Sequence, residues 1–373
     1  MNGTASAGNS TTFSRSDHIH PEDSNLRNAI DMLCLESTGD TNDRTDEIIS
    51  RLQNYKKCVL GTGIFYTTGI NMPDGSSLIG SGDATTLFKD NERSNTNYVV
   101  NMNKNNTISN LCIDGNNNNI TETIGTHHGI LWEGNYSTNS SAAATWPQNG
   151  KLSNLTIKNC DGGGITCNNT GTKRFNNIVA CNVAIMNCNT GINIPYYSEY
   201  HRFTNFDVFE CYYGCINNGG NNCFANCDFS DSKSIGFVID NPDFTIEEPD
   251  NNKKNNSHGT CVGCSFNHIA NNTGLALSLK GVGNGFTFGN CNIFRGSVEI
   301  INSTGVEITD SLFGEDLSIT ISNSQAIVFS DLSFQNNPTI TITESPSTYF
   351  KNCLNYKTGG YIPESVGLED RID

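Results

Sequence analysis

The stretch NLTIKNC, residues 154–160, decides the fold because variants of it recur along the chain. Each copy begins with an anchor residue (Asn, Asp or Gly), carries two apolar residues at period two, and leads through a turn into a second short strand. The last four anchors, Asn290, Asp310, Asp331 and Asn352, lie 20, 21 and 21 residues apart. A constant period with strands in every unit predicts a solenoid, because no unit can bury its apolar face alone. The copies are NLCIDGN (110–116), NLTIKNC (154–160), NVAIMNC (182–188), NFDVFEC (205–211), NCDFSDS (226–232), GCSFNHI (263–269), NCNIFRG (290–296), DSLFGED (310–316) and DLSFQNN (331–337).

Composition excludes several classes of partner. The chain has 373 residues and a net charge of −16, so we expect no binding to nucleic acid or to anionic membranes. Only 16 % of the residues are charged, and Asn, Gly, Ser and Thr supply the polarity, as in strands joined by tight turns. Met1 to Gly8 has neither a basic start nor an apolar stretch, which predicts no signal peptide, and no apolar run is long enough to span a membrane.

The 15 cysteines are interpreted as packing residues. Cys160, Cys188 and Cys211 occupy the same place, six residues after the anchor, on successive repeats. This predicts a column of small buried side chains in a chain assembled in a reducing compartment. The spacings CxxxC and CxxC also suit metal ligands, but each falls within the repeat.

The repeat divides the chain into four segments. Residues 1–24 form a polar N-terminal attachment segment, and residues 25–56 form a helical cap with helical spacing over 25–35 and 44–55. Residues 57–355 form the repeat, with first strands at 57–60, 64–66 and 76–79, and residues 356–373 form an acidic tail. Asp43 and Thr45 are candidate N-caps for the second helix. The cap is expected to cover strand edges at the open end of the stack.

Two long gaps between anchors predict surface loops. Asn110 and Asn154 are 44 residues apart, and Asn226 and Gly263 are 37 apart. Both tryptophans, Trp132 and Trp146, lie in the first gap. An indole in a polar loop suits stacking on a carbohydrate, although it can equally cap a core.

The N-terminal third resembles the pectate-lyase-like superfamily. The resemblance is carried by TGD at Thr38 and by KKCVLGTGIFYTTGINMPDGSSLIGSGDATTLF, residues 56–88, followed by the repeats. It implies an all-β fold, a right-handed parallel β-helix with coils of about 21 residues, and it does not specify an activity.

The segment TTFSRSDHIHPED, residues 11–23, resembles a stretch common in bacteriophage tail fibre and tailspike proteins. The resemblance implies a virion protein assembled in the host cytoplasm and acting at the host surface. It implies a homotrimer attached through its N-terminus to other tail or head proteins and recognising bacterial surface polysaccharide.

Stacked carboxylates are the first candidate site. In a parallel stack, equivalent positions on adjacent coils are about 4.8 Å apart. Residues at +1 and +3 from the anchor should point inward and those at +2 outward, which makes Asp207 and Asp228 exposed neighbours. Two carboxylates this close raise one pKa and give an acid beside an ionised partner, as glycosidases require. The alternative is a solvated polar column or a cation site.

The stretch PYYSEYHRF, residues 195–203, is the second candidate site. Its tyrosines offer flat faces to sugar rings, and its charged residues offer an acid, a base and a cation for an anionic sugar. We therefore take Glu199, Asp207 and Asp228 as catalytic candidates. The ligand-binding candidates are Trp132, Trp146, Tyr196, Tyr197, Tyr200, His201 and Arg202. The tyrosines can also simply cover a turn.

His18 and His20 form an HxH pair. Three copies on a trimer axis would bring six imidazoles together, enough for an octahedral transition metal, and similar pairs occur in phage fibre proteins. The function otherwise requires no cofactor. Two readings compete with a polysaccharide depolymerase: a non-enzymatic fibre or adhesin, and a secreted bacterial polysaccharide lyase or hydrolase.

Overall fold

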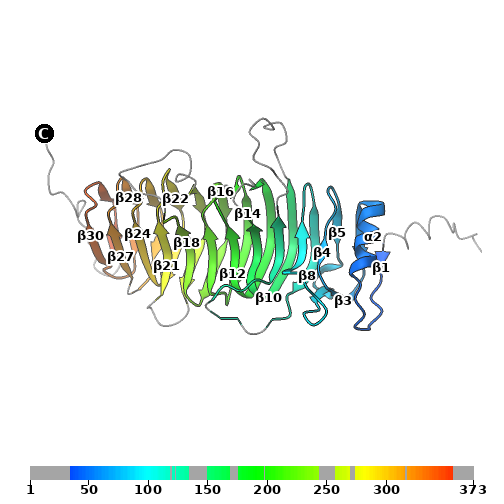
Figure 1. Cartoon of the computed structure of the whole chain (residues 1–373). Helices are drawn as coiled ribbons and strands as arrows, with labels where there is room; N and C mark the ends of the chain where they lie inside the picture. Colours follow the sequence, from blue (N-terminus) through cyan, green and yellow to red (C-terminus); the bar gives the residue numbers. More distant parts are fainter. Residues whose placement is uncertain are drawn as a thin grey trace, which may run out of the picture.

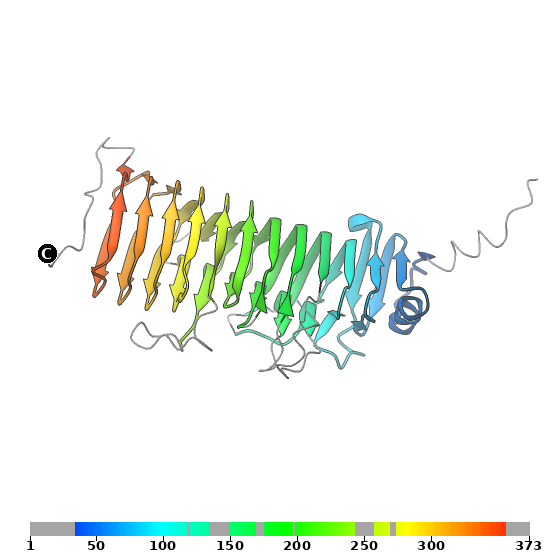
Figure 2. The same cartoon turned by 90° about the horizontal axis from the view of Figure 1, so that it is seen from above.

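The computed structural model is one long parallel β-helix, drawn from its blue N-terminal end to its orange C-terminal end in Figure 1. It describes residues 34–117, 120–121, 123–133, 149–168, 175–196, 198–242, 257–268, 274–315 and 317–355. The sequence predicted this fold class, and the prediction is confirmed. The coils lie side by side along one axis in both views (Figures 1 and 2).

Three stacks of parallel strands make up the coil walls, and each strand pairs with its equivalents on the coils before and after it. The first stack consists of β1 (Cys34–Leu35), β2 (Lys57–Leu60), β5 (Ser77–Ile79), the starts of β8 (Thr107–Asp114), β10 (Gly150–Asn168), β12 (Ile178–Ile194) and β14 (Arg202–Phe209), then β16 (Gly220–Ala225), β19 (His258–Val262), β22 (Phe286–Gly289), β25 (Val306–Thr309), β28 (Ile327–Ser330) and β31 (Thr348–Lys351).

The second stack follows the anchor residue of each coil. It consists of β3 (Gly63–Thr67), β6 (Thr85–Lys89), later parts of β8, β10, β12 and β14, then β17 (Asp228–Ser232), β20 (Ser265–His268), β23 (Asn292–Arg295), β26 (Leu312–Phe313), β29 (Ser333–Phe334) and β32 (Leu354–Asn355). The third stack consists of β4 (Ile70–Asn71), β7 (Tyr98–Met102), β9 (His128–Glu133), the ends of β10 and β12, then β15 (Tyr213–Asn217), β18 (Ile235–Asp240), β21 (Leu275–Lys280), β24 (Ser297–Ile301), β27 (Ser318–Ser322) and β30 (Thr339–Thr343). A separate pair joins β11 (Phe175–Asn176) to β13 (Ser198–Glu199).

The anchor asparagines form the corner between the first and second stacks. Asn154, Asn182 and Asn205 have φ values of 53°, 54° and 55°, in the left-handed region that Asn tolerates better than most residues. Their amides also pair from coil to coil. Asn154 donates to Asn110 at 2.9 Å, Asn182 donates to Asn154 at 3.1 Å, and Asn205 donates to Asn182 at 3.1 Å. One residue type thus supplies both the turn and the bond that holds the turns in register.

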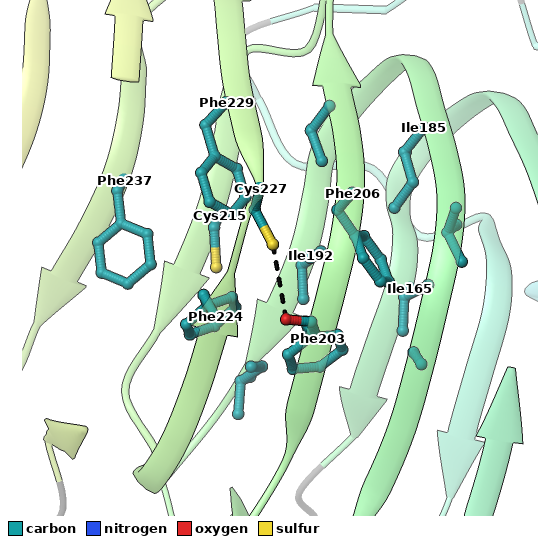
Figure 3. Close-up of a cluster of buried hydrophobic side chains, with 14 of the residues drawn as sticks. Ile165, Ile185, Ile192, Phe203, Phe206, Cys215, Phe224, Cys227, Phe229 and Phe237 are labelled. Carbon is teal, nitrogen blue, oxygen red and sulfur yellow. Dashed lines mark hydrogen bonds between the residues drawn. The ribbon is translucent and has the colours of Figure 1, made fainter. Parts of the chain in front are cut away.

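The interior is a continuous column of apolar side chains. The residues at +1 and +3 point inward as predicted, and Leu155, Ile157, Val183 and Ile185 are all buried. Phenylalanines stack between coils, with Phe203 and Phe224 rings 5.1 Å apart and 13° from parallel. Figure 3 shows this part of the core, where the buried Cys227 thiol lies 3.6 Å from the Phe203 carbonyl oxygen. Such stacking adds to the free energy of burial.

The predicted column of buried cysteines is confirmed. Cys160, Cys188 and Cys211 are fully buried, and Cys160 pairs with Cys188 in register. All 15 cysteines are free thiols. Burial raises the pKa of Cys188, so this thiol stays protonated and packs as a small hydrophobe.

The N-terminal end is covered by α2 (Thr45–Tyr55), seen at the blue end of Figure 1. Its buried residues include Ile48 and Leu52, and the Asp43 carboxylate accepts hydrogen bonds from the Thr45 amide and hydroxyl. The predicted helix is therefore confirmed, but its N-cap is Arg44, and neither Asp43 nor Thr45 occupies that position. The helix predicted over 25–35 lies outside the described residues except for Cys34–Leu35, which form β1 instead. Among the described residues, no helix is long and apolar enough to cross a membrane.

The asparagine corner gives a test of stability. Asn182→Ala removes two amide hydrogen bonds and places alanine in the left-handed region, which together should cost about 2–4 kcal/mol of unfolding free energy. Asn182→Gly removes the same bonds without the backbone strain and should cost roughly 1–2 kcal/mol. Urea unfolding followed by circular dichroism measures both. Asn292→Ala, at an exposed strand position, is the control and should change stability by no more than about 0.5 kcal/mol. Equal midpoints for the two Asn182 variants would contradict the strain argument.

Candidate functional site

An open groove of about 420 Å³ lies on the outer face of the second stack. Outward residues of three successive coils, Thr156, Ala184 and Asp207, line it together with the anchors Asn154, Asn182 and Asn205. Its remaining wall is the short helix η1 (Gly82–Ala84), where Asp83 accepts a hydrogen bond from the Thr156 hydroxyl at 2.8 Å. The groove is therefore lined by the asparagine corner, by the outer face of the strands and by η1, whose Asp83 is 73 residues from Thr156 in sequence.

Asp207 and Asp228 are paired in register at the end of this groove. They are direct partners on β14 and β17, so their Cα atoms are separated by about the 4.8 Å strand spacing. Asp207 is exposed and lines the groove, whereas Asp228, one coil further along, is half-buried. The expectation that the two carboxylates are neighbours on the outer face is confirmed.

The environment of Asp228 favours its protonated form. Burial is the main cause that raises the pKa of the Asp228 carboxyl. A hydrogen bond from Ser230 opposes this shift in pKa, and the negative charges of Asp207 and Asp231 add to it. Asp228 Oδ1 is buried and has no hydrogen-bond partner among the described residues. The site therefore places a carboxyl group with a raised pKa beside an exposed carboxylate, which is the arrangement that general acid–base chemistry needs.

The second candidate segment lies across the corner from this pair. Tyr200 is 45 % exposed, and Arg202 is exposed at the start of β14 on the first stack. The left-handed turn at Asn205 then carries the chain onto the second stack before Asp207. Glu199, in β13, pairs with β11 and does not line the groove. This segment and Asp207 therefore lie on different faces of the coil, because the corner separates them.

His201 is a buried structural residue, which corrects its assignment as a base for a sugar. Its side chain is completely buried, Nδ1 accepts a hydrogen bond from the Ile178 amide at 3.1 Å, and Nε2 lies 2.7 Å from the Ser198 hydroxyl. Burial lowers the pKa of His201 to about 3. The imidazole is therefore neutral and inaccessible to a glycan. Tyr196 is also engaged, since its hydroxyl donates to the Asp240 carbonyl at 3.1 Å.

Trp132 belongs to the core, which corrects its assignment as a sugar platform. Its side chain is 1 % exposed, and a Cβ atom at Gly150 would lie 1.8 Å from its ring. The indole thus fills the space that Gly150, on the next coil of the first stack, leaves open. This agrees with the alternative interpretation, in which the indole caps the core. Trp146, Tyr197, His18 and His20 lie outside the described residues.

Two features of the surface were not predicted. Asp83 was missed because its relation to Thr156 arises only when the coils stack. The Asp161 carboxylate accepts bonds from the His127 amide at 2.8 Å and from the Asn117 amide group at 2.8 Å, with His127 Nδ1 3.1 Å away. Neither arrangement has a signal in local sequence. No group of three or more His, Cys, Asp or Glu side chains suited to a metal occurs in the described ranges.

No family model matches this chain, and no curated protein sequence does either. Solved structures are similar in fold. The A-modules of the mannuronan C-5 epimerases AlgE6 and AlgE4 of Azotobacter vinelandii superpose with TM-scores of 0.58 and 0.52 at 13 % and 11 % identity, covering 88 % of this chain and 98 % of each module. The tailspike gp49 of Acinetobacter baumannii bacteriophage Fri1, a capsular polysaccharide depolymerase, superposes with a TM-score of 0.51 at 13 % identity. That match covers 86 % of this chain and 58 % of the tailspike. The chain therefore has the parallel β-helix fold found in phage tailspikes and in polysaccharide-active enzymes.

The burial of His201 predicts a pH dependence of stability. Its pKa is about 3 in the folded protein and 6.5 when unperturbed, so the unfolded chain binds the extra proton between these values. Stability therefore falls as the pH falls through this window, by about 1.4 kcal/mol per pH unit from this residue. His201→Gln keeps an acceptor for the Ile178 amide and should flatten the slope by that amount. Urea midpoints at several pH values measure it, and a slope equal to that of wild type would show that His201 titrates normally.

Proposed function

We propose that this chain is a tailspike-type receptor-binding protein that recognises bacterial surface polysaccharide in the groove of the second stack. The observation that carries the proposal is the groove itself, an open surface across three coils, lined by amide, hydroxyl and carboxylate groups and ending at the Asp207–Asp228 pair. Hydroxyl, amide and carboxylate groups in fixed register suit the hydroxyl groups of a sugar chain. The fold shared with a capsular polysaccharide depolymerase supports it, as does the tail-fibre-like segment TTFSRSDHIHPED.

Cleavage of the bound glycan is the reaction that the carboxylate pair supports. Asp228, whose raised pKa favours its protonated form, would donate a proton to the glycosidic oxygen as the carbon–oxygen bond breaks. Asp207 would act as the ionised partner, either attacking the anomeric carbon or taking a proton from the attacking water. The first route, which retains the configuration, would need the two carboxyl groups about 5–5.5 Å apart, and the second, which inverts it, about 6.5–9.5 Å.

A non-enzymatic adhesin is the second candidate function. The groove is open to solvent along its length, and the exposed residues Tyr200 and Arg202 offer further contacts on the neighbouring face. An open surface can hold a glycan chain without enclosing the reacting bond. In that case the same groove would adsorb the virion to its host and leave the polysaccharide intact.

Substitutions in the groove separate these functions. Ala184→Trp should fill the groove and weaken polysaccharide binding by at least about tenfold. Asp207→Asn and Asp228→Asn should keep binding but lower the rate of cleavage by roughly 10² to 10⁴. Glu307→Gln removes an exposed carboxylate on the first stack and serves as the control. Binding is measured on immobilised host polysaccharide, and cleavage by new reducing ends.

The outcomes are distinct. If Ala184→Trp still binds the polysaccharide, the binding site does not lie in the groove. Binding that Ala184→Trp abolishes, with no cleavage by wild type, would leave the adhesin function.

We also propose that the protein is a homotrimer of the virion, joined to other tail or head proteins through residues 1–24, with a transition metal held by His18 and His20. Residues 1–24 have no core pattern of their own and would need partners to become ordered. Light scattering should give three chains, and metal analysis should find bound metal that is lost in the His18→Ala, His20→Ala double variant. A metal-free trimer of unchanged stability would exclude these histidines as ligands, and a monomer would exclude the assembly.

A further inference from the structure

The charges around the groove define which glycans it can accept. Asp83 and Asp207 line it, and Asp228 lies one coil beyond Asp207. Glu210 and Asp231 are exposed at the ends of the same two strands. No lysine, arginine or histidine lines the groove within the part of the chain that the structure describes.

The lysines and arginines on the strands around the groove do not line it. Lys158, on the same stack as Thr156, is 3.5 Å from the Asp114 carboxylate. Lys233 lies over the ring of Tyr212, 5.6 Å from its centroid. Arg202 is on the first stack, across the Asn205 corner, and Arg295 is two coils beyond Asp228. A uronate or other acidic sugar in the groove would therefore face carboxylates without a matching positive charge.

The two carboxylates of the groove both lie on its outer surface. Asp83 is fixed by the Thr156 hydroxyl, and Asp207 is fixed on the outward side of β14 because its neighbours Phe206 and Val208 are buried. Like charges a few ångströms apart repel each other, and at an exposed surface this repulsion is largest at low salt. Free hydroxyl groups, by contrast, donate well to carboxylates.

Resting on the function proposed above, we infer that the groove binds an uncharged stretch of polysaccharide and rejects polyuronates. Asp83 is then a specificity-determining residue, which accepts hydrogen bonds from sugar hydroxyls and repels acidic sugars.

The test uses the full chain and a set of immobilised neutral and acidic capsular polysaccharides, with polymannuronate as the polyanion probe. Wild type should bind the uncharged polymers in the groove, and Ala184→Trp should abolish this binding. Its affinity should change by less than about twofold between roughly 50 and 500 mM NaCl. Asp83→Asn keeps an acceptor for Thr156 and should raise the weak binding of polymannuronate by about tenfold at the lower salt concentration. Glu307→Gln, which removes a charge outside the groove, should leave this binding unchanged.

The inference is overturned if wild type binds polymannuronate, or another uronate polymer, as tightly as it binds the neutral polymers and in a manner that Ala184→Trp abolishes. The assay is run with calcium and with a chelator, and binding that needs calcium counts equally against the inference, because the cation would then supply the missing charge. If Ala184→Trp affects no polysaccharide at all, the proposed function itself fails and the inference fails with it. A different outcome would separate the two proposals. If neutral polysaccharides bind in the groove but Asp83→Asn does not change the binding of polymannuronate, the proposed function stands and Asp83 does not determine the specificity.

Discussion

The corner asparagine is the constraint on which the rest of the structure depends. It must adopt a left-handed backbone, and its amide must meet the amide of the coils above and below. In the coils from Asn110 to Asn205 these requirements fix where the chain turns and oppose the slipping of one coil against the next. A slip of a single residue would exchange the buried and exposed faces of the whole strand. The register of the apolar core is thus maintained from outside the core, by polar groups on its edge.

Strict register also creates the chemistry of the candidate site. Side chains at the same position of adjacent coils are forced to within about the strand spacing, whatever their charges. At most positions they are compatible, as in the asparagine column. At Asp207 and Asp228 two carboxylates meet, and the burial of Asp228 raises its pKa beyond what the neighbouring charge alone would do. An acid beside a carboxylate therefore arises from stacking alone, without a cleft to enclose it.

The features that the repeat determines could be predicted from the sequence. Coil positions, inward residues, the cysteine column and the Asp207–Asp228 pairing all follow from counting from the anchor. The burial of residues that lie between the repeats could not be predicted from the repeat, because it depends on contacts with other coils. His201 resembled a base in an exposed loop, yet the Ile178 amide and the Ser198 hydroxyl enclose it. Trp132 lies in the core, where Gly150 has no side chain to occupy the space of its ring.

The division between core and surface explains why the groove lacks aromatic residues. The phenylalanines near it, Phe206 and Phe229, sit at inward positions, where they stack and fill the wide interior of the coils. The outward positions on the same strands then carry small or acidic side chains such as Ala184 and Asp207. Because each coil contacts only its neighbours, an outward residue can change without disturbing the register of the stack. Recognition in this fold is therefore set coil by coil along a rigid surface. In the proposed groove, a change at a single outward position would therefore alter the surface that a sugar meets while leaving the coils beneath it in place.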